Sequence, residues 1–125
     1  RTVAALIKHM QVLVPGDTGL GHIAGAVGVP VVTLSGPTQV ISTRPWKAPG
    51  VVVSTRENLH CMPCYGTRRY GCCPYEQRCM QGIERQDVLD AISAMLNHKT
   101  GLEDVPQAHC ERRGGAQAGG ARRDV

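Results

Sequence analysis

The chain has 125 residues with a formal net charge of +4, and only 3% of its residues are aromatic. This length allows one domain at most, and a weak positive charge with few rings argues against a nucleic-acid binder, which needs a dense basic stripe and stacking platforms. No apolar run approaches the roughly 18 residues of a membrane span and no basic leader precedes an apolar segment, so we expect neither a span nor a secretion signal in this stretch.

The first third of the chain carries two helical patterns and one strand pattern. Apolar residues at three- and four-residue spacing predict the end of an amphipathic helix from Arg1 to about Met10, and the strand pattern covers Gln11 to Pro15. Small apolar side chains predict a second helix from about Gly19 to Val27, which Gly28 and the following Pro30 end. Because the chain begins inside a periodic segment, we expect it to be a piece of a longer protein.

The alternation of strand and helix continues along the chain. A second strand is predicted at Val31 to Ser35, a turn at Gly36 to Thr38, a short helical piece before Pro45 and a third strand at Val51 to Ser54. Such alternation predicts an α/β fold with a Rossmann-like parallel sheet. Three strands make a thin core, which indicates the trailing half of a larger sheet.

Composition divides the chain into two parts. Residues 1–97 are expected to form a partial Rossmann-like domain, which includes a Cys-rich loop at 56–81 and a closing helix from about Arg85 to Asn97. Residues 98–125 are rich in Gly, Ala, Arg and Gln, with almost nothing to bury, and are expected to form a flexible tail.

The turn before the second helix is the candidate binding site. The first N–H groups of a helix lack intrahelical partners and carry the positive end of its dipole, so they stabilise a diphosphate, and glycines at 16, 19 and 21 keep its approach open. The Thr18 hydroxyl can cap the helix or donate to a phosphate. Asp17 suits the hydroxyls of a sugar or a nearby cation, and His22, four residues after Thr18, can point into the same crevice.

Each of these residues also has a plainer interpretation. Asp17 or Thr18 could be an N-cap alone, His22 a partly buried structural histidine, and the glycines packing points between helix and sheet. Capping needs only one such side chain, so it does not account for the convergence of all of them at one sheet edge. The set therefore favours a binding site.

One stretch of the chain resembles the signature of the ADP-heptose:lipopolysaccharide heptosyltransferases, glycosyltransferase family 9. The resemblance is carried by Asp17-Thr18-Gly19-x-x-His22-x-Ala24-x-Ala26-x-Gly28-x-Pro30-Val31-Val32-x-Leu34-x-Gly36-Pro37-Thr38. The Cys61-x-x-Cys64 pair and Cys79-Met80 are similar to a cysteine-containing segment of a subset of the family. The sequence departs from the family pattern at Leu20-Gly21 and at Ser35.

The resemblance implies the trailing part of the C-terminal domain of a GT-B glycosyltransferase, in which residues 1–97 form a partial nucleotide-sugar-binding domain. It also implies a cytoplasmic enzyme, with a peripheral contact to the inner membrane surface allowed. The implied reaction transfers heptose from an ADP-heptose donor to the lipopolysaccharide core acceptor with inversion, without metal or cofactor. By position, Asp17 would contact the heptose, Thr18 and Gly19 would line the diphosphate, and His22 would sit at the donor. The family's catalytic base belongs to the first domain, so no residue here is expected to be catalytic and the segment alone is expected to be inactive.

The Cys-rich loop leaves other interpretations open. Cys61, Cys64, Cys72, Cys73 and Cys79 could surround a zinc ion, pack as ordinary thiols or form disulfides, and the irregular spacing of the later cysteines lowers the specificity for zinc. A zinc ribbon with Arg68, Arg69, Tyr65 and Tyr70 would make the chain a nucleic-acid or protein binding module, although the modest charge argues against this. Another nucleotide-sugar enzyme of the same fold, such as an epimerase, is a further alternative.

Overall fold

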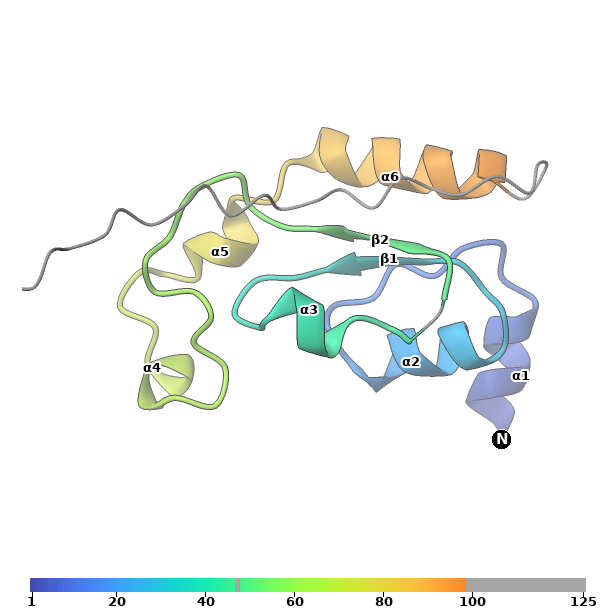
Figure 1. Ribbon diagram of the computed structural model, residues 1–125, viewed down its shortest axis with the longest axis horizontal. Coiled ribbons are helices and arrows are strands. Elements are labelled where there is room, and N and C mark those ends of the chain that lie inside the picture. The colour runs from blue at the N-terminus through green and yellow to red at the C-terminus, as the bar shows by residue number, and fades with distance from the viewer. Residues whose placement is uncertain (47, 99–125) are drawn as a thin grey trace, which may run out of the picture.

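The computed structural model describes residues 1–46 and 48–98 (Figure 1). Helices and strands alternate along the first half, and the second half holds short helices followed by one long one. In chain order the elements are α1 (Thr2–Lys8), α2 (Gly19–Ala26), β1 (Val31–Leu34), α3 (Val40–Thr43), β2 (Gly50–Val53), α4 (Arg68–Gly71), α5 (Arg78–Gln81) and α6 (Arg85–His98).

The two strands form a parallel sheet, as the alternating pattern predicts. Val31 pairs with Gly50 and Leu34 with Val53 at the two ends of the register. A β carbon on Gly50 would lie 2.6 Å from the carbonyl oxygen of Val31, so only glycine fits at this end of β2. The α/β fold class is therefore correct for the described residues.

The strand predicted at Gln11 to Pro15 is reduced to isolated bridges. Leu13 bridges Val31 and Gly16 bridges Leu34, both parallel, with hydrogen bonds of 2.9 Å from the Leu34 amide to the Pro15 carbonyl and from the Leu13 amide to the Pro30 carbonyl. Pro15 has no N–H to donate, so a continuous ladder cannot form through it. The segment nevertheless runs alongside β1 as a third extended chain.

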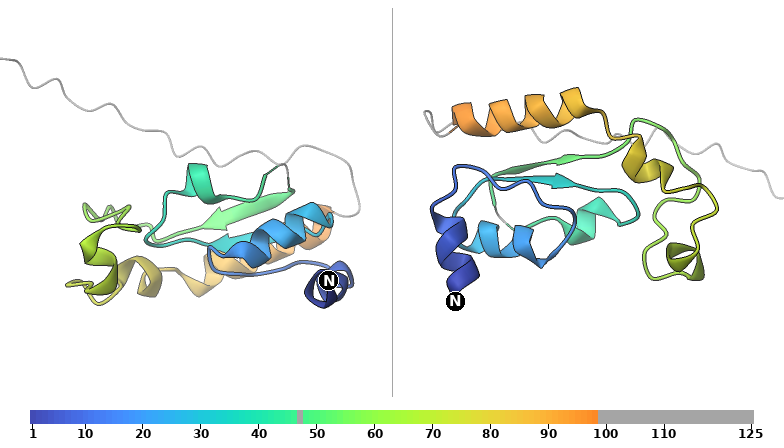
Figure 2. Two further views of the ribbon diagram at one scale, coloured as in Figure 1. Left: turned by 90° about the horizontal axis from the view of Figure 1, so that it is seen from below. Right: turned by 180° about the vertical axis from the view of Figure 1, so that it is seen from behind.

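Helices cover both faces of the sheet. Neighbouring residues of β1 point to opposite faces. On one face, Val31 packs with Ile7, Ala24 and Val29 beneath α1 and α2. On the other face, Val32 packs under α6 in a second cluster with Val53, Ala91 and Met95. Figure 1 and the right-hand view of Figure 2 show the strands between α6 on one side and α1 and α2 on the other.

The helix predictions from periodicity are confirmed within a few residues at each end. The helix predicted to end at Val27 ends at Ala26, and Gly28 follows with a φ of +77°, a conformation that favours glycine. The closing helix extends through His98, one residue beyond the prediction. The rest of the predicted tail, residues 99–125, lies outside the described residues.

The Cys-rich loop connects β2 to α6 and contains the one-turn helices α4 and α5. It is fastened to the turn after β1, because the Pro37 carbonyl accepts hydrogen bonds of 2.9 Å from the amides of Cys64 and Tyr65. A β carbon on Gly36 would lie 2.5 Å from the Met80 sulfur, so α5 also packs closely on this turn. Within residues 1–46 and 48–98, no helix has the length and apolar character needed to cross a bilayer.

Candidate functional site

The candidate site lies where two parallel segments end beside each other. Gly16 bridges Leu34, so Asp17 follows one segment at the same sheet edge at which Ser35 follows β1. In Figure 1 the start of α2, the tips of both strand arrows and the Cys-rich loop lie toward the same end of the molecule. Ligands of open α/β sheets bind at this carboxyl edge.

The start of α2 is open at this edge. Thr18 occupies the N-cap position with extended backbone angles (φ −141°, ψ 166°), and in the structure as described its hydroxyl makes no capping hydrogen bond. Thr18 is exposed, and a β carbon added at Gly16 or Gly19 would meet no described atom within 4 Å. The hydroxyl and the first helical amides are therefore accessible to a ligand, and side-chain capping by Thr18 is not observed.

Asp17 carries an unsatisfied polar atom. Its side chain is half-buried, and within the described part of the chain its Oδ2 is buried without a hydrogen-bond partner. A buried carboxylate oxygen without a donor costs free energy, so such atoms in folded proteins call for a physical explanation. Among the described residues, this carboxylate therefore has hydrogen-bonding capacity that the fold does not use.

His22 is exposed, which contradicts the interpretation of a partly buried structural histidine. It lies in the first turn of α2, four residues after Thr18, so both side chains occupy one edge of the helix. Of the glycines in the turn, only Gly21 is a packing point, since a β carbon there would lie 3.4 to 3.7 Å from Pro45, Pro15 and Val31. Packing therefore does not account for Gly16 and Gly19.

The turn after β1 lies at the same edge of the sheet, and the sequence pattern predicts no ligand contact for it. Ser35 is buried, and its hydroxyl lies 3.0 Å from that of Thr38, so the two side chains hold the turn closed. Thr38 is the last residue of the family motif, so the sequence does contain one signal for this pair of hydroxyl groups. The described residues bring Asp17, Thr18 and Gly19 to the sheet edge together with this turn.

The cysteines form a separate cluster. Burial raises the pKa of the Cys79 thiol, and the neighbouring Cys64, Cys73 and Cys61 raise it further. Cys64 and Cys79 are buried and Cys72 is exposed, and all the cysteines of the described loop are free thiols. In the part of the chain that the structure describes, no group of three or more His, Cys, Asp or Glu side chains is placed to hold a metal ion.

Comparisons with known proteins agree with the site motif. The family model for glycosyltransferase family 9 (heptosyltransferase) matches residues 1–73. Lipopolysaccharide heptosyltransferase 3 of Escherichia coli is 31% identical over 106 residues, which cover 85% of this chain and 28% of that protein. A crystal structure of a glycosyl transferase family 9 protein from Veillonella parvula superposes with a TM-score of 0.62 at 23% identity, over 77% of this chain and 26% of that one.

These matches place the chain in the class of glycosyltransferases, as an enzyme fragment with a parallel α/β fold. The chain spans only about a quarter of the length of both relatives. It belongs to glycosyltransferase family 9, the heptosyltransferase family. The alternative of a zinc-ribbon binding module is not favoured.

Proposed function

We propose that this chain is the donor-binding portion of a longer heptosyltransferase, the trailing part of the C-terminal Rossmann-like domain of a GT-B enzyme. The whole enzyme would transfer heptose from ADP-heptose to the inner core of lipopolysaccharide, with inversion at the anomeric carbon. Residues 1–97 would hold the donor and residues 98–125 would form a tail. The enzyme would be cytoplasmic, with a peripheral contact to the inner membrane surface where its acceptor is displayed.

The observation that carries the proposal is the open, uncapped start of α2 at the carboxyl edge of the sheet, directly after Asp17, whose Oδ2 has no hydrogen-bond partner among the described residues. A carboxylate repels phosphate and accepts hydrogen bonds from hydroxyls, so we assign Asp17 to the heptose. The Thr18 hydroxyl and the backbone at Gly19 face the diphosphate, which the positive end of the helix dipole stabilises. His22 stands at the donor on the same edge of the helix.

This arrangement would stabilise ADP as the leaving group of the transfer. As the bond from the anomeric carbon to the diphosphate breaks, negative charge grows on the departing ADP, and fixed N–H and hydroxyl donors stabilise it. Inverting transfer also needs a general base for the acceptor hydroxyl. We assign that base to a part of the enzyme outside these residues, and therefore expect the chain alone to bind donor without turnover.

Two observations support a longer parent. The E. coli relative is covered over only 28% of its length. Large apolar side chains are also exposed on α1 and the segment after it, with exposed fractions of 48% for Val3, 61% for Leu6 and 41% for Met10. Such a row is typical of a helix that packs against further structure.

The test is a comparison of ADP and ADP-heptose binding by the chain and by Asp17→Asn, followed by NMR amide shifts and calorimetry. We expect Asp17→Asn to weaken ADP-heptose binding by tenfold or more and to leave ADP binding unchanged, because Asp17 contacts the sugar. Asp90→Asn makes the same chemical change on α6, away from the edge, and should bind as wild type. Equal affinity of Asp17→Asn and wild type for ADP-heptose, or no shift of the Gly19 and Leu20 amides with ADP, would contradict the proposal.

A further inference from the structure

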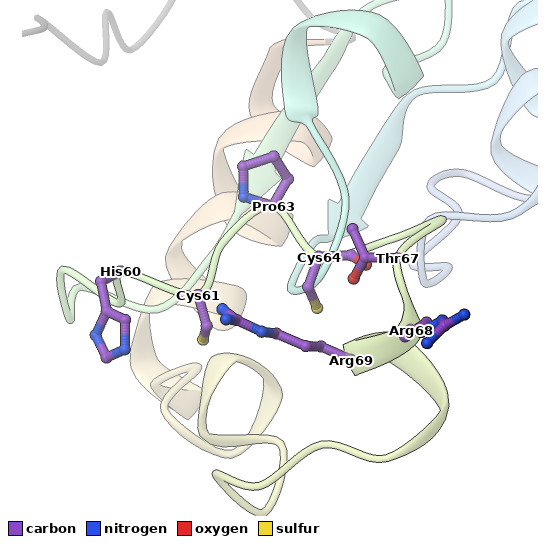
Figure 3. Close-up of a pocket in the computed structure, with 7 residues that line it drawn as sticks. All are labelled: His60, Cys61, Pro63, Cys64, Thr67, Arg68 and Arg69. Carbon is purple, nitrogen blue, oxygen red and sulfur yellow. The ribbon is translucent and has the colours of Figure 1, made fainter.

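The Cys-rich loop encloses a hollow of about 360 Å³ (Figure 3). Its walls come from the segment before α4 and from α4 itself. The lining residues are His60, Cys61, Pro63, Cys64, Thr67, Arg68 and Arg69. None of these belongs to the donor motif, so the hollow is separate from it.

The charge of the hollow is positive and unbalanced. Two other arginines near the loop are already paired, Arg56 with Asp87 and Arg78 with Glu57. Arg68 and Arg69, in contrast, form no ion pair with any described residue, and no carboxylate lines the hollow. In Figure 3 the side chain of Arg69 runs from α4 toward the Cys61–Cys64 segment, so its guanidinium lies across the hollow.

The other lining groups leave the arginines as the principal donors. The Thr67 hydroxyl donates to the Cys64 carbonyl at 2.6 Å, and His60 Nε2 lies 3.0 Å from the Tyr75 hydroxyl. Cys61, Pro63 and Cys64 offer mainly apolar surface and no strong hydrogen-bond donor, whereas Arg68 and Arg69 are exposed and accessible to a ligand. A guanidinium in such a place binds phosphate or carboxylate through paired hydrogen bonds.

The loop holds this hollow near the donor edge. Cys64 lines the hollow, and its amide donates to the Pro37 carbonyl in the turn after β1. Figure 1 shows α4 and α5 beyond the ends of the strands, toward the end of the molecule at which α2 starts. A group bound in the hollow would therefore be held near the sheet edge that carries the donor motif.

We propose that this hollow binds an anionic substituent, a phosphate or carboxylate, of the sugar acceptor. The assignment to the acceptor rests on the proposed transferase function, whereas anion binding itself does not. Tyr65 and Tyr70 form an edge-to-face pair with centroids 5.1 Å apart, next in sequence to Cys64 and Arg69, and both are exposed. Their rings offer an apolar face with a polar tip, which suits the sugar that carries the charge.

The test uses three probes on the chain: glucose 6-phosphate, glucuronate and glucose, with binding followed by NMR shifts of the residue 60–70 amides. We expect at least one charged sugar to bind tenfold or more tightly than glucose, and the stronger of the two identifies phosphate or carboxylate as the preferred group. Arg69→Gln and Arg68→Gln should each weaken that binding by tenfold or more.

Arg85→Gln is the matched control, since it removes the same charge from an exposed position of α6 outside the hollow. Equal binding of charged and neutral sugars would overturn the inference, and so would an equal loss in Arg69→Gln and Arg85→Gln. ADP-heptose binding is measured on the same variants. If the chain binds ADP-heptose but binds no anionic sugar, only the anion site in the hollow is rejected. If ADP-heptose binds equally to wild type and Asp17→Asn, only the donor site is rejected.

Discussion

The carbonyl oxygen of Pro37 accepts a 2.9 Å hydrogen bond from the amide of Cys64 and so joins the Cys-rich loop to the turn that follows β1. Twenty-six intervening residues separate the two groups, and they include all of β2. This contact places the loop, with its own hollow, beside the sheet edge that carries the donor motif.

Thr18→Ala distinguishes a helix cap from a ligand contact. A capping threonine contributes about 1 kcal/mol of stability, but the described hydroxyl of Thr18 makes no capping bond. We therefore expect a change in unfolding free energy within about 0.5 kcal/mol, measured by urea denaturation, together with weaker ADP binding. A loss of about 1 kcal/mol with unchanged ADP binding would identify Thr18 as a cap.

Asp17→Ala should not destabilise the free protein. The variant removes a buried carboxylate oxygen that has no donor among the described residues, and such an atom costs about 1–3 kcal/mol. Thermal unfolding without ligand should show an equal or higher midpoint than wild type. A marked fall in the midpoint would mean that the carboxylate has a structural partner and would weaken its assignment to the sugar.

Gly50→Ala should destabilise the sheet, because the added carbon would lie 2.6 Å from the main-chain oxygen of Val31. Since a backbone atom of the paired strand cannot move aside, we expect a cost of about 1–3 kcal/mol. Gly71→Ala is the control, for a β carbon there meets no described atom within 4 Å. Chemical denaturation of both variants is the measurement, and similar stabilities would show that β2 lies farther from β1.

Met95→Ala should open a cavity under α6. Met95 is fully buried against Val32, Val53 and Ala91, so its truncation should cost about 2–5 kcal/mol. Its neighbour Leu96 is 37% exposed, and Leu96→Ala should cost clearly less. If the two variants unfold at the same urea concentration, α6 does not pack on the sheet through the face described.

The Arg56–Asp87 ion pair predicts a pH dependence. Arg56 donates to both carboxylate oxygens of Asp87 and lowers the pKa of that carboxyl below its usual value. A lowered folded-state pKa gives a stabilisation that is present above the unfolded-state value and is lost as pH falls through the folded one. Asp87→Asn should thus lower the melting temperature slightly at pH 7 and not at all well below about pH 4.

Salt provides the control for that pair, since Arg56 is largely exposed. The difference between wild type and Asp87→Asn should shrink in 1 M salt, where the screening length is about 3 Å. A difference that persists unchanged at low pH and in high salt would assign the effect to helix packing rather than to charge.

Local patterns were sufficient to predict most helices and both strands of the sheet. The spacing of apolar residues located α1, α2 and α6, and Gly28 marked the end of α2, because helical periodicity and the glycine conformation depend on neighbours a few residues apart. The motif from Asp17 to Thr38 also sufficed for the family. The contacts of these residues with donor stay predictions.

Tertiary packing decided the rest. Whether the segment before Asp17 forms a full strand depends on its ladder with β1, and Pro15 interrupts that ladder. The Cys-rich loop has no apolar periodicity, so its sequence pattern does not predict where the cysteines lie. Their positions depend on the contacts of Cys64 with Pro37 and of α5 with Gly36. The sequence by itself determined most of the elements and the family motif. The Asp17 oxygen and the two arginines of the hollow, which have no partner among the described residues, are placed only when residues distant in the chain meet.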